Sequence, residues 1–119
     1  MSCCEKDNDK CAGRLPHSEA VNLLQQVQYA DGSIVSRTLA DTGGGSVTLF
    51  AFDRGQSLSE HTAPFDALVQ VLEGEIELTI GDRDITVSGG LSALMPANIP
   101  HALKAVEKSK MLLVMIKEL

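Results

Sequence analysis

Turn residues recur along this chain at short, regular intervals, and this spacing constrains the fold more than any other feature of the sequence. Groups such as Gly81–Arg83 and Ser88–Gly90 return about every eight to twelve residues over the 119 residues. The segments between them are short for helices, and some alternate apolar and polar side chains, as Glu75 to Ile80 does. Short strands at such spacing predict an all-β domain, either a sandwich or a barrel.

About nine strands are expected, with little helix. Their predicted ranges are 27–29, 34–40, 46–52, 67–72, 75–80, 84–87, 91–95, 101–106 and 111–116. The Asp31-Gly32 pair between the first two predicts a tight hairpin. Upstream, Ser18 is a candidate cap for a short helix over 18–27, where leucine and valine recur at roughly helical spacing. A short 3₁₀ turn leading into a strand is the alternative for this segment.

The first residues of the chain differ in character from the rest. Residues 1–14 are polar and are expected to form a flexible tail, followed by a single barrel domain over residues 15–119. The tail holds Cys3, Cys4 and Cys11, an odd number that argues against a disulfide framework, and it lacks the apolar stretch of a secretory signal. We therefore expect a cytoplasmic protein.

Charge and hydropathy limit the partners of the chain. The net charge is −6 and no basic cluster is present, which argues against binding to nucleic acid. The longest unbroken apolar run, Met111 to Ile116, has six residues, whereas a membrane span needs about 20. The segments 46–52 and 111–116 are apolar on both faces, although a barrel wall has one inner face. Because their outward side chains need cover, we expect a homodimer that buries them.

Two stretches, 55–74 and 90–105, resemble the two sequence motifs of the cupin superfamily. Gly55, His61 and Gly74 match the first motif, and Gly90, Pro96 and His101 match the second. The fifteen residues between Gly74 and Gly90 match the short spacing of small single-domain members. The resemblance implies an antiparallel, cupin-type jelly-roll barrel with both stretches lining its interior.

The departures from the family pattern bear on metal binding. Members of the family typically hold a metal on three histidines and one glutamate. Here Ala63 stands at the second histidine position and Ala67 at the glutamate position. Ala105 replaces the asparagine that follows the second-motif histidine. Asn98 replaces a turn glycine, which is a mild change because asparagine also tolerates a left-handed turn.

Strand parity extends these positions into a predicted cavity lining, because alternate residues of a strand face the same side. With the two histidines at the bottom of the cavity, the predicted pocket residues are His61, Ala63, Ala67, Val69, Val71, His101, Leu103 and Ala105. Two imidazoles in an otherwise apolar cavity favour a small, mainly apolar ligand with one polar end.

Metal chemistry at the same place is an alternative. His61 and His101 supply two ligands, whereas a catalytic zinc usually has three protein ligands and non-haem iron uses two histidines and a carboxylate. Asp66 would be the third ligand if a bulge after Pro64 turned it inward. Otherwise water would complete the coordination of a weakly bound divalent metal ion.

Three functions therefore stay open. The first is a cupin that binds a small molecule around His61 and His101, which we favour because two metal ligands are missing. The second is a metal-dependent enzyme, an oxygenase, isomerase or lyase, as many cupins are. The third is a structural barrel that acts through its dimer surface. The sequence identifies neither a substrate nor a reaction, since the cupin fold hosts unrelated chemistries.

Overall fold

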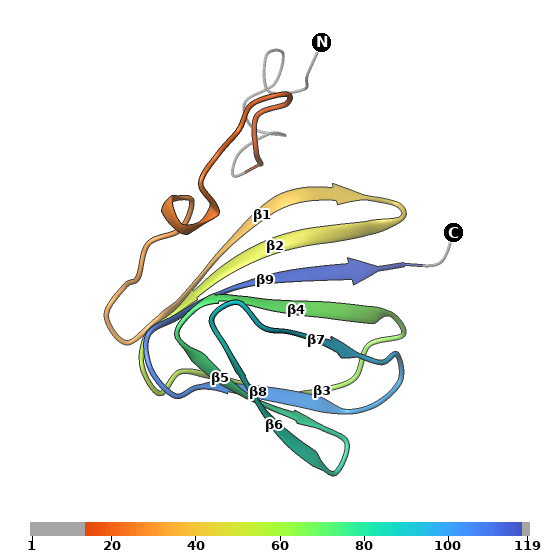
Figure 1. Ribbon diagram of the computed structural model, residues 1–119. Coiled ribbons are helices and arrows are strands. Elements are labelled where there is room, and N and C mark those ends of the chain that lie inside the picture. Colours follow the sequence, from red (N-terminus) through yellow and green to blue (C-terminus); the bar gives the residue numbers. More distant parts are fainter. Residues whose placement is uncertain (1–13, 118–119) are drawn as a thin grey trace.

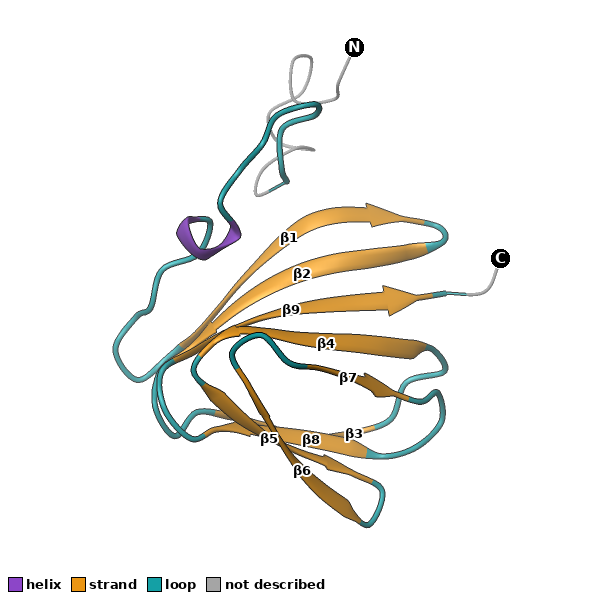
Figure 2. Ribbon diagram, viewed as in Figure 1, coloured by secondary structure: helices purple, strands orange, loops and turns teal. Residues whose placement is uncertain are grey.

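Two antiparallel β-sheets face each other in the computed structural model, which describes residues 14–117 (Figure 1). The strands are β1 (Ile34–Thr42), β2 (Gly45–Phe52), β3 (Ser57–His61), β4 (Asp66–Glu73), β5 (Glu75–Ile80), β6 (Arg83–Ser88), β7 (Ser92–Met95), β8 (His101–Ala105) and β9 (Ser109–Ile116). One sheet has the order β1-β2-β9-β4-β7 and the other β3-β8-β5-β6. From Ile34 onward, the described chain consists of strands and the turns between them (Figure 2). The prediction of an all-β domain is confirmed.

Alternation along the strands places the core between the two sheets. In β4, Ala67, Val69 and Val71 are buried, whereas the residues between them are partly exposed. The facing sheet contributes Ile76 and Leu78 of β5, which are fully buried. Burial stabilises the fold by about 1.5–3 kcal/mol for each large apolar side chain, so this layer holds the two sheets together.

Gly74 alone connects β4 to β5 and so carries the chain from one sheet to the other. Its φ is +89°, a left-handed conformation that glycine adopts readily. A Cβ at this position would press into the carbonyl oxygen of Lys108 and the hydroxyl of Ser109. The close packing of this crossing therefore requires the glycine.

The predicted helix over 18–27 does not form, and its alternative, a 3₁₀ turn, is present at Leu23–Gln25. The cap is Asn22, whose side-chain oxygen accepts a hydrogen bond from the backbone N–H of Leu24, and not Ser18. A turn this short buries no residue of its own, so it is held by the chain around it.

The predicted strand at 27–29 is absent, and the hairpin predicted at Asp31-Gly32 is therefore wrong. The turn itself forms, but it leads into β1 from an irregular segment. That segment, residues 15–29, lies along the outside of the five-stranded sheet near β1 and β2 and is called the strap below (Figure 1).

The strap is held by apolar contacts with the outer face of β1 and β2. Val27 is 4% exposed and belongs to one cluster with Leu39, Leu49 and Ala51. At the other end of the strap, the backbone N–H of Leu15 donates to the carbonyl oxygen of Leu39 at 3.1 Å. The apolar residues of the strap, which suggested a helix and a strand in the sequence, thus cover the outer face of the five-stranded sheet.

Two side chains of the barrel fasten the end of the strap. Tyr29 donates its hydroxyl hydrogen to Oε2 of Glu73 at 2.6 Å. Burial and the neighbouring Glu73 carboxylate raise the pKa of Tyr29, so the hydroxyl remains a donor. The buried Lys110 donates to the carbonyl oxygen of Leu24, and its Nζ lies 5.0 Å from the centre of the Tyr29 ring.

The strap covers part of the outer face for which the sequence suggested a second subunit. Further along this face, Val114 of β9, Leu68 of β4 and Leu94 of β7 are cross-strand neighbours in one row. Leu94 is 54% exposed. The homodimer thus stays a prediction, and the apolar row is the surface that it would bury.

Most of the predicted tail, residues 1–14, lies outside the described part of the chain. Its three cysteines fall there: Cys3, Cys4 and Cys11. Arg14 is described, and its Nη1 donates to the carbonyl oxygen of Asp41 at 3.1 Å. Where the structure describes the chain, no helix has the length and apolar composition that crossing a membrane requires.

Candidate functional site

His61 and His101 face each other across the pair of strands β3 and β8. Their Cα atoms are register partners, and the register shifts between Leu58 and His61 just before this pair. The two Nε2 atoms are 3.0 Å apart, and the rings meet edge to face with their centroids 4.2 Å apart. His101 is buried but His61 is exposed. The sequence had suggested a pair at the bottom of the cavity. The exposure of His61 instead places the pair toward the open side of the barrel.

Both rings are held from behind by backbone carbonyl groups. Nδ1 of His61 is 3.0 Å from the carbonyl oxygen of Ser59, and Nδ1 of His101 is 3.2 Å from that of Ile99. Because a carbonyl oxygen can only accept, both Nδ1 atoms carry the hydrogen in these contacts. Burial, with a smaller contribution from His61, lowers the pKa of His101 against the opposing effect of the Ile99 carbonyl.

A cavity of about 270 Å³ opens beside the two rings. Its lining residues are Leu58, His61, Ala63, Ala67, Met95, His101, Leu103, Met111, Leu113 and Met115. The two imidazoles are the polar side chains of this set, and the others are apolar. Such a cavity suits a small apolar molecule with a single polar end.

Five of the eight predicted pocket residues line this cavity: His61, Ala63, Ala67, His101 and Leu103. The other three, Val69, Val71 and Ala105, are completely buried in the core and are not part of the lining. They occupy inward positions of β4 and β8, as parity predicts, but the core around them leaves no open space.

The methionines of the lining were not predicted from the sequence. Met95 of β7 and Met115 of β9 are the register partners of Ala67 on either side of β4. Thioethers therefore flank the position where the family resemblance would place a glutamate. The six-residue run 111–116 contains Met111 and Met115, and alternate members of a strand had to face inward. Because both faces of the run are apolar, its sequence does not show which members those are.

The loops at the edge of the cavity are tied to each other. The backbone N–H of Asn98 donates to the carbonyl oxygen of Ala63 at 2.8 Å. The carboxylate of Asp66 accepts a hydrogen bond from the backbone N–H of Ala97 at 2.8 Å. Asn98 has a φ of +64°, the left-handed turn expected for a residue that replaces a glycine. Asp66 thus holds the loop after β7 and does not join the two histidines.

The described residues do not fit the divalent metal that the family resemblance implies. Within residues 14–117, no three histidine, cysteine, aspartate or glutamate side chains come close enough to hold an ion together. His61 and His101 offer two neutral nitrogens, with no carboxylate to offset the charge of a divalent ion. We therefore derive no reaction step through a metal.

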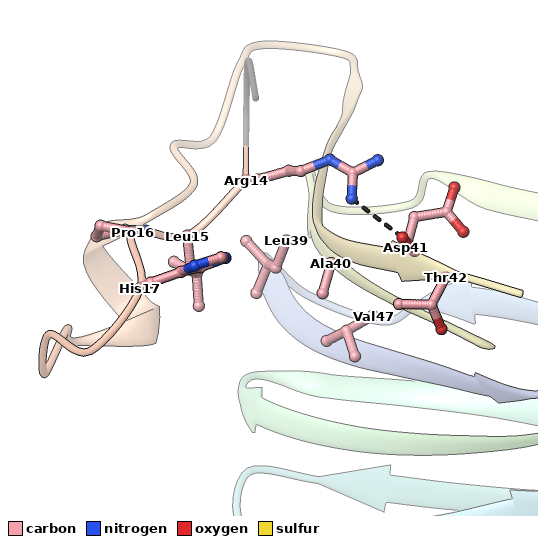
Figure 3. Close-up of a pocket in the computed structure, with 9 residues that line it drawn as sticks. All are labelled: Arg14, Leu15, Pro16, His17, Leu39, Ala40, Asp41, Thr42 and Val47. Carbon is pink, nitrogen blue, oxygen red and sulfur yellow. Dashed lines mark hydrogen bonds between the residues drawn. The ribbon is translucent and has the colours of Figure 1, made fainter. Parts of the chain in front are cut away.

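A second hollow, of about 350 Å³, lies between the start of the strap and strands β1 and β2 (Figure 3). Arg14 spans it by donating to the backbone carbonyl of Asp41, as the dashed line shows. The other ionisable side chains in the lining are His17 and Asp41. The hollow is larger than the barrel cavity, but its described lining holds no group of three metal-ligating side chains.

Comparison with known proteins gives consistent results. A family model described as a cupin domain matches residues 48–117. A conserved protein of unknown function from Streptococcus pyogenes is 39% identical in sequence, with a TM-score of 0.85, and the match covers 89% of this chain and 93% of that one. A cupin superfamily protein from Desulfitobacterium hafniense is 27% identical, with a TM-score of 0.83 and coverage of 88% and 96%.

A third solved structure is longer than this chain. It is a cupin 2 conserved barrel domain protein from Leptotrichia buccalis, 43% identical with a TM-score of 0.79. The match covers 82% of this chain but 47% of that one. Among curated proteins, none matches the sequence.

Proposed function

The chain belongs to the cupin superfamily, and from this premise we propose that its barrel cavity binds a small, mainly apolar molecule beside His61 and His101. The observation that carries the proposal is the lining: apolar side chains surround about 270 Å³ of space, with the imidazole pair as its polar end. Ligand sites have this composition, with many apolar contacts for affinity and a few polar groups for orientation. A metal-dependent reaction receives no comparable support, because the ligand set is incomplete.

Filling the cavity is expected to block binding. Ala67→Leu places a larger side chain among Met95 and Met115, so the affinity for a small aromatic probe such as p-cresol is expected to fall at least about tenfold. The matched control is Ala40→Leu, the same substitution at an exposed position of β1. Binding is measured by calorimetry and by the rise in melting temperature that the probe produces.

Two results would refute the proposal. One is the absence of any binding to the natural protein at millimolar probe concentrations. The other is an equal affinity in the natural protein and the Ala67→Leu variant, because the probe would then bind outside the cavity.

We also propose that two copies of the chain associate through the outer face of the five-stranded sheet. The row Val114, Leu68 and Leu94 is apolar across three adjacent strands, and a second copy can present the same row to it about a two-fold axis. Sedimentation velocity is expected to show a dimer at micromolar concentration and a monomer for Leu94→Glu. Leu91→Glu is the matched control, because Leu91 is equally exposed but precedes β7. A monomeric natural protein would refute this arrangement.

A further inference from the structure

On the basis of the proposed function, we propose that the molecule bound in the cavity presents a hydrogen-bond donor, such as a hydroxyl group, to the facing Nε2 atoms of His61 and His101. The two imidazole rings have too few hydrogens for the contacts that they make, and the polar end of the ligand supplies the missing one.

The histidine pair makes three contacts that each need a hydrogen. Two are the Nδ1 contacts with the carbonyl oxygens of Ser59 and Ile99, and the third joins the two Nε2 atoms at 3.0 Å. Each neutral imidazole carries one N–H, so the pair has two hydrogens for three contacts. With both Nδ1 atoms donating to carbonyls, two Nε2 lone pairs point at each other, and the pair is one hydrogen short.

An additional proton on the pair is a costly way to supply this hydrogen. His101 is 5% exposed, and the side chains around the pair in the cavity lining are apolar. A positive charge on the buried His101 ring loses hydration without gaining a counter-charge, because His61 is the other titratable group in the lining. The same burial lowers the pKa of His101.

A donor on the ligand supplies the hydrogen without adding charge. Any molecule that fills the cavity displaces solvent from the two Nε2 atoms. If it carries a hydroxyl group, the lone pair of one Nε2 atom receives a hydrogen bond. The lone pair of the other Nε2 atom then no longer faces an unpaired lone pair that repels it. If it carries an ether oxygen or a carboxylate, further lone pairs are brought toward those already present. Leaving the buried Nε2 of His101 without a donor costs more than a good hydrogen bond gains, so the discrimination is expected to be large.

The rest of the lining fits the body of such a molecule. Met95, Met111 and Met115 supply flexible, polarisable sulfur atoms, which make favourable contacts with aromatic rings. A small phenol therefore combines the ring that the methionines favour with the donor that the histidines lack. Its hydroxyl stays protonated at neutral pH, as that of tyrosine does with a pKa near 10.

Three probes of one shape test the inference on the natural protein. These are p-cresol, its methyl ether 4-methylanisole, and p-toluate, titrated by calorimetry at pH 7.5 in buffer with a metal chelator. We expect p-cresol to bind at least about tenfold more tightly than either of the others, which is the effect of one hydrogen bond to a buried acceptor. The His61→Leu variant removes one acceptor, so the preference for p-cresol over its ether is expected to shrink toward equality.

A spectroscopic measurement is independent of how well any variant folds. Nitrogen-15 NMR of the two imidazoles in the natural protein is expected to show a protonated Nδ1 and a bare Nε2 in both rings. On titration with p-cresol, the Nε2 signals are expected to shift, whereas 4-methylanisole leaves them nearly unchanged.

The outcomes separate this inference from the proposed function. If none of the probes binds, the proposed function itself fails. If p-cresol and 4-methylanisole bind equally, the cavity takes apolar molecules but the donor inference is wrong. Tighter binding of p-toluate would mean that the pair carries a positive charge, which also overturns the inference.

Discussion

The double substitution Ala63→His with Ala67→Glu is expected to raise the affinity of the cavity for a divalent metal ion by several orders of magnitude. Both alanines line the cavity that holds His61 and His101, so the new side chains would face the existing pair. Three imidazoles and a carboxylate fill a coordination sphere that two imidazoles leave half empty, and the carboxylate offsets the charge of the ion. Metal content after dialysis and calorimetric titration with Zn²⁺ or Mn²⁺ measure the effect.

The matched control for this experiment is Ala63→His with Ala67→Gln. Glutamine has nearly the volume of glutamate but no charge, so this variant is expected to bind the ion far more weakly than the glutamate variant. A natural protein that already retains about one metal per chain after dialysis would contradict this expectation. So would a glutamate variant that binds the ion no more tightly than the natural chain.

Gly74→Ala is expected to destabilise the fold by about 4 kcal/mol, since two costs combine at this position. The φ of +89° strains any residue with a side chain, at about 1–3 kcal/mol. The new methyl group would also press into the carbonyl of Lys108 and the hydroxyl of Ser109, and overpacking costs a further 1–3 kcal/mol or so. The Ser109 side chain cannot easily move away, because its buried hydroxyl accepts a hydrogen bond from the N–H of Glu75 and donates one to the carbonyl of Glu75.

Gly90→Ala is the control that separates the two costs. Gly90 has a φ of +91°, but a Cβ there would meet no atom within 4 Å. This variant is expected to lose about 1–3 kcal/mol, which is the backbone strain alone. Urea denaturation of both variants gives the comparison, and equal losses at Gly74 and Gly90 would show that the contact with Ser109 contributes nothing.

Strands with clear alternation could be predicted from the sequence, whereas β3 and the strap could not. The predicted strand 75–80 coincides with β5, because one of its faces is apolar and the other polar. β3 has a single apolar side chain, Leu58, and its pairing depends on β8 more than on its own sequence. The apolar residues of the strap are placed by the outer face of the β1–β2 hairpin that follows it, a tertiary contact that local patterns do not contain.

The site could be predicted in part. Motif spacing pointed to His61 and His101, and the structure brings their Nε2 atoms to 3.0 Å. Spacing did not reveal that His61 is exposed at the open side, because this depends on the register shift before it. Parity also could not select which half of β9 faces the cavity. Met111, Leu113 and Met115 do so, but their neighbours on the strand are equally apolar.

The position of β9 in its sheet has a consequence for how the protein is made. β9 lies between β2 and β4, and its Val114 pairs with Val47 on one side and Leu68 on the other. As the chain leaves the ribosome, the β1–β2 hairpin and the β4 region emerge with open edges that only β9 can join. Such edges are sites of aggregation until they are paired. A nascent chain thus acquires its cavity only when β9 emerges and closes the sheet.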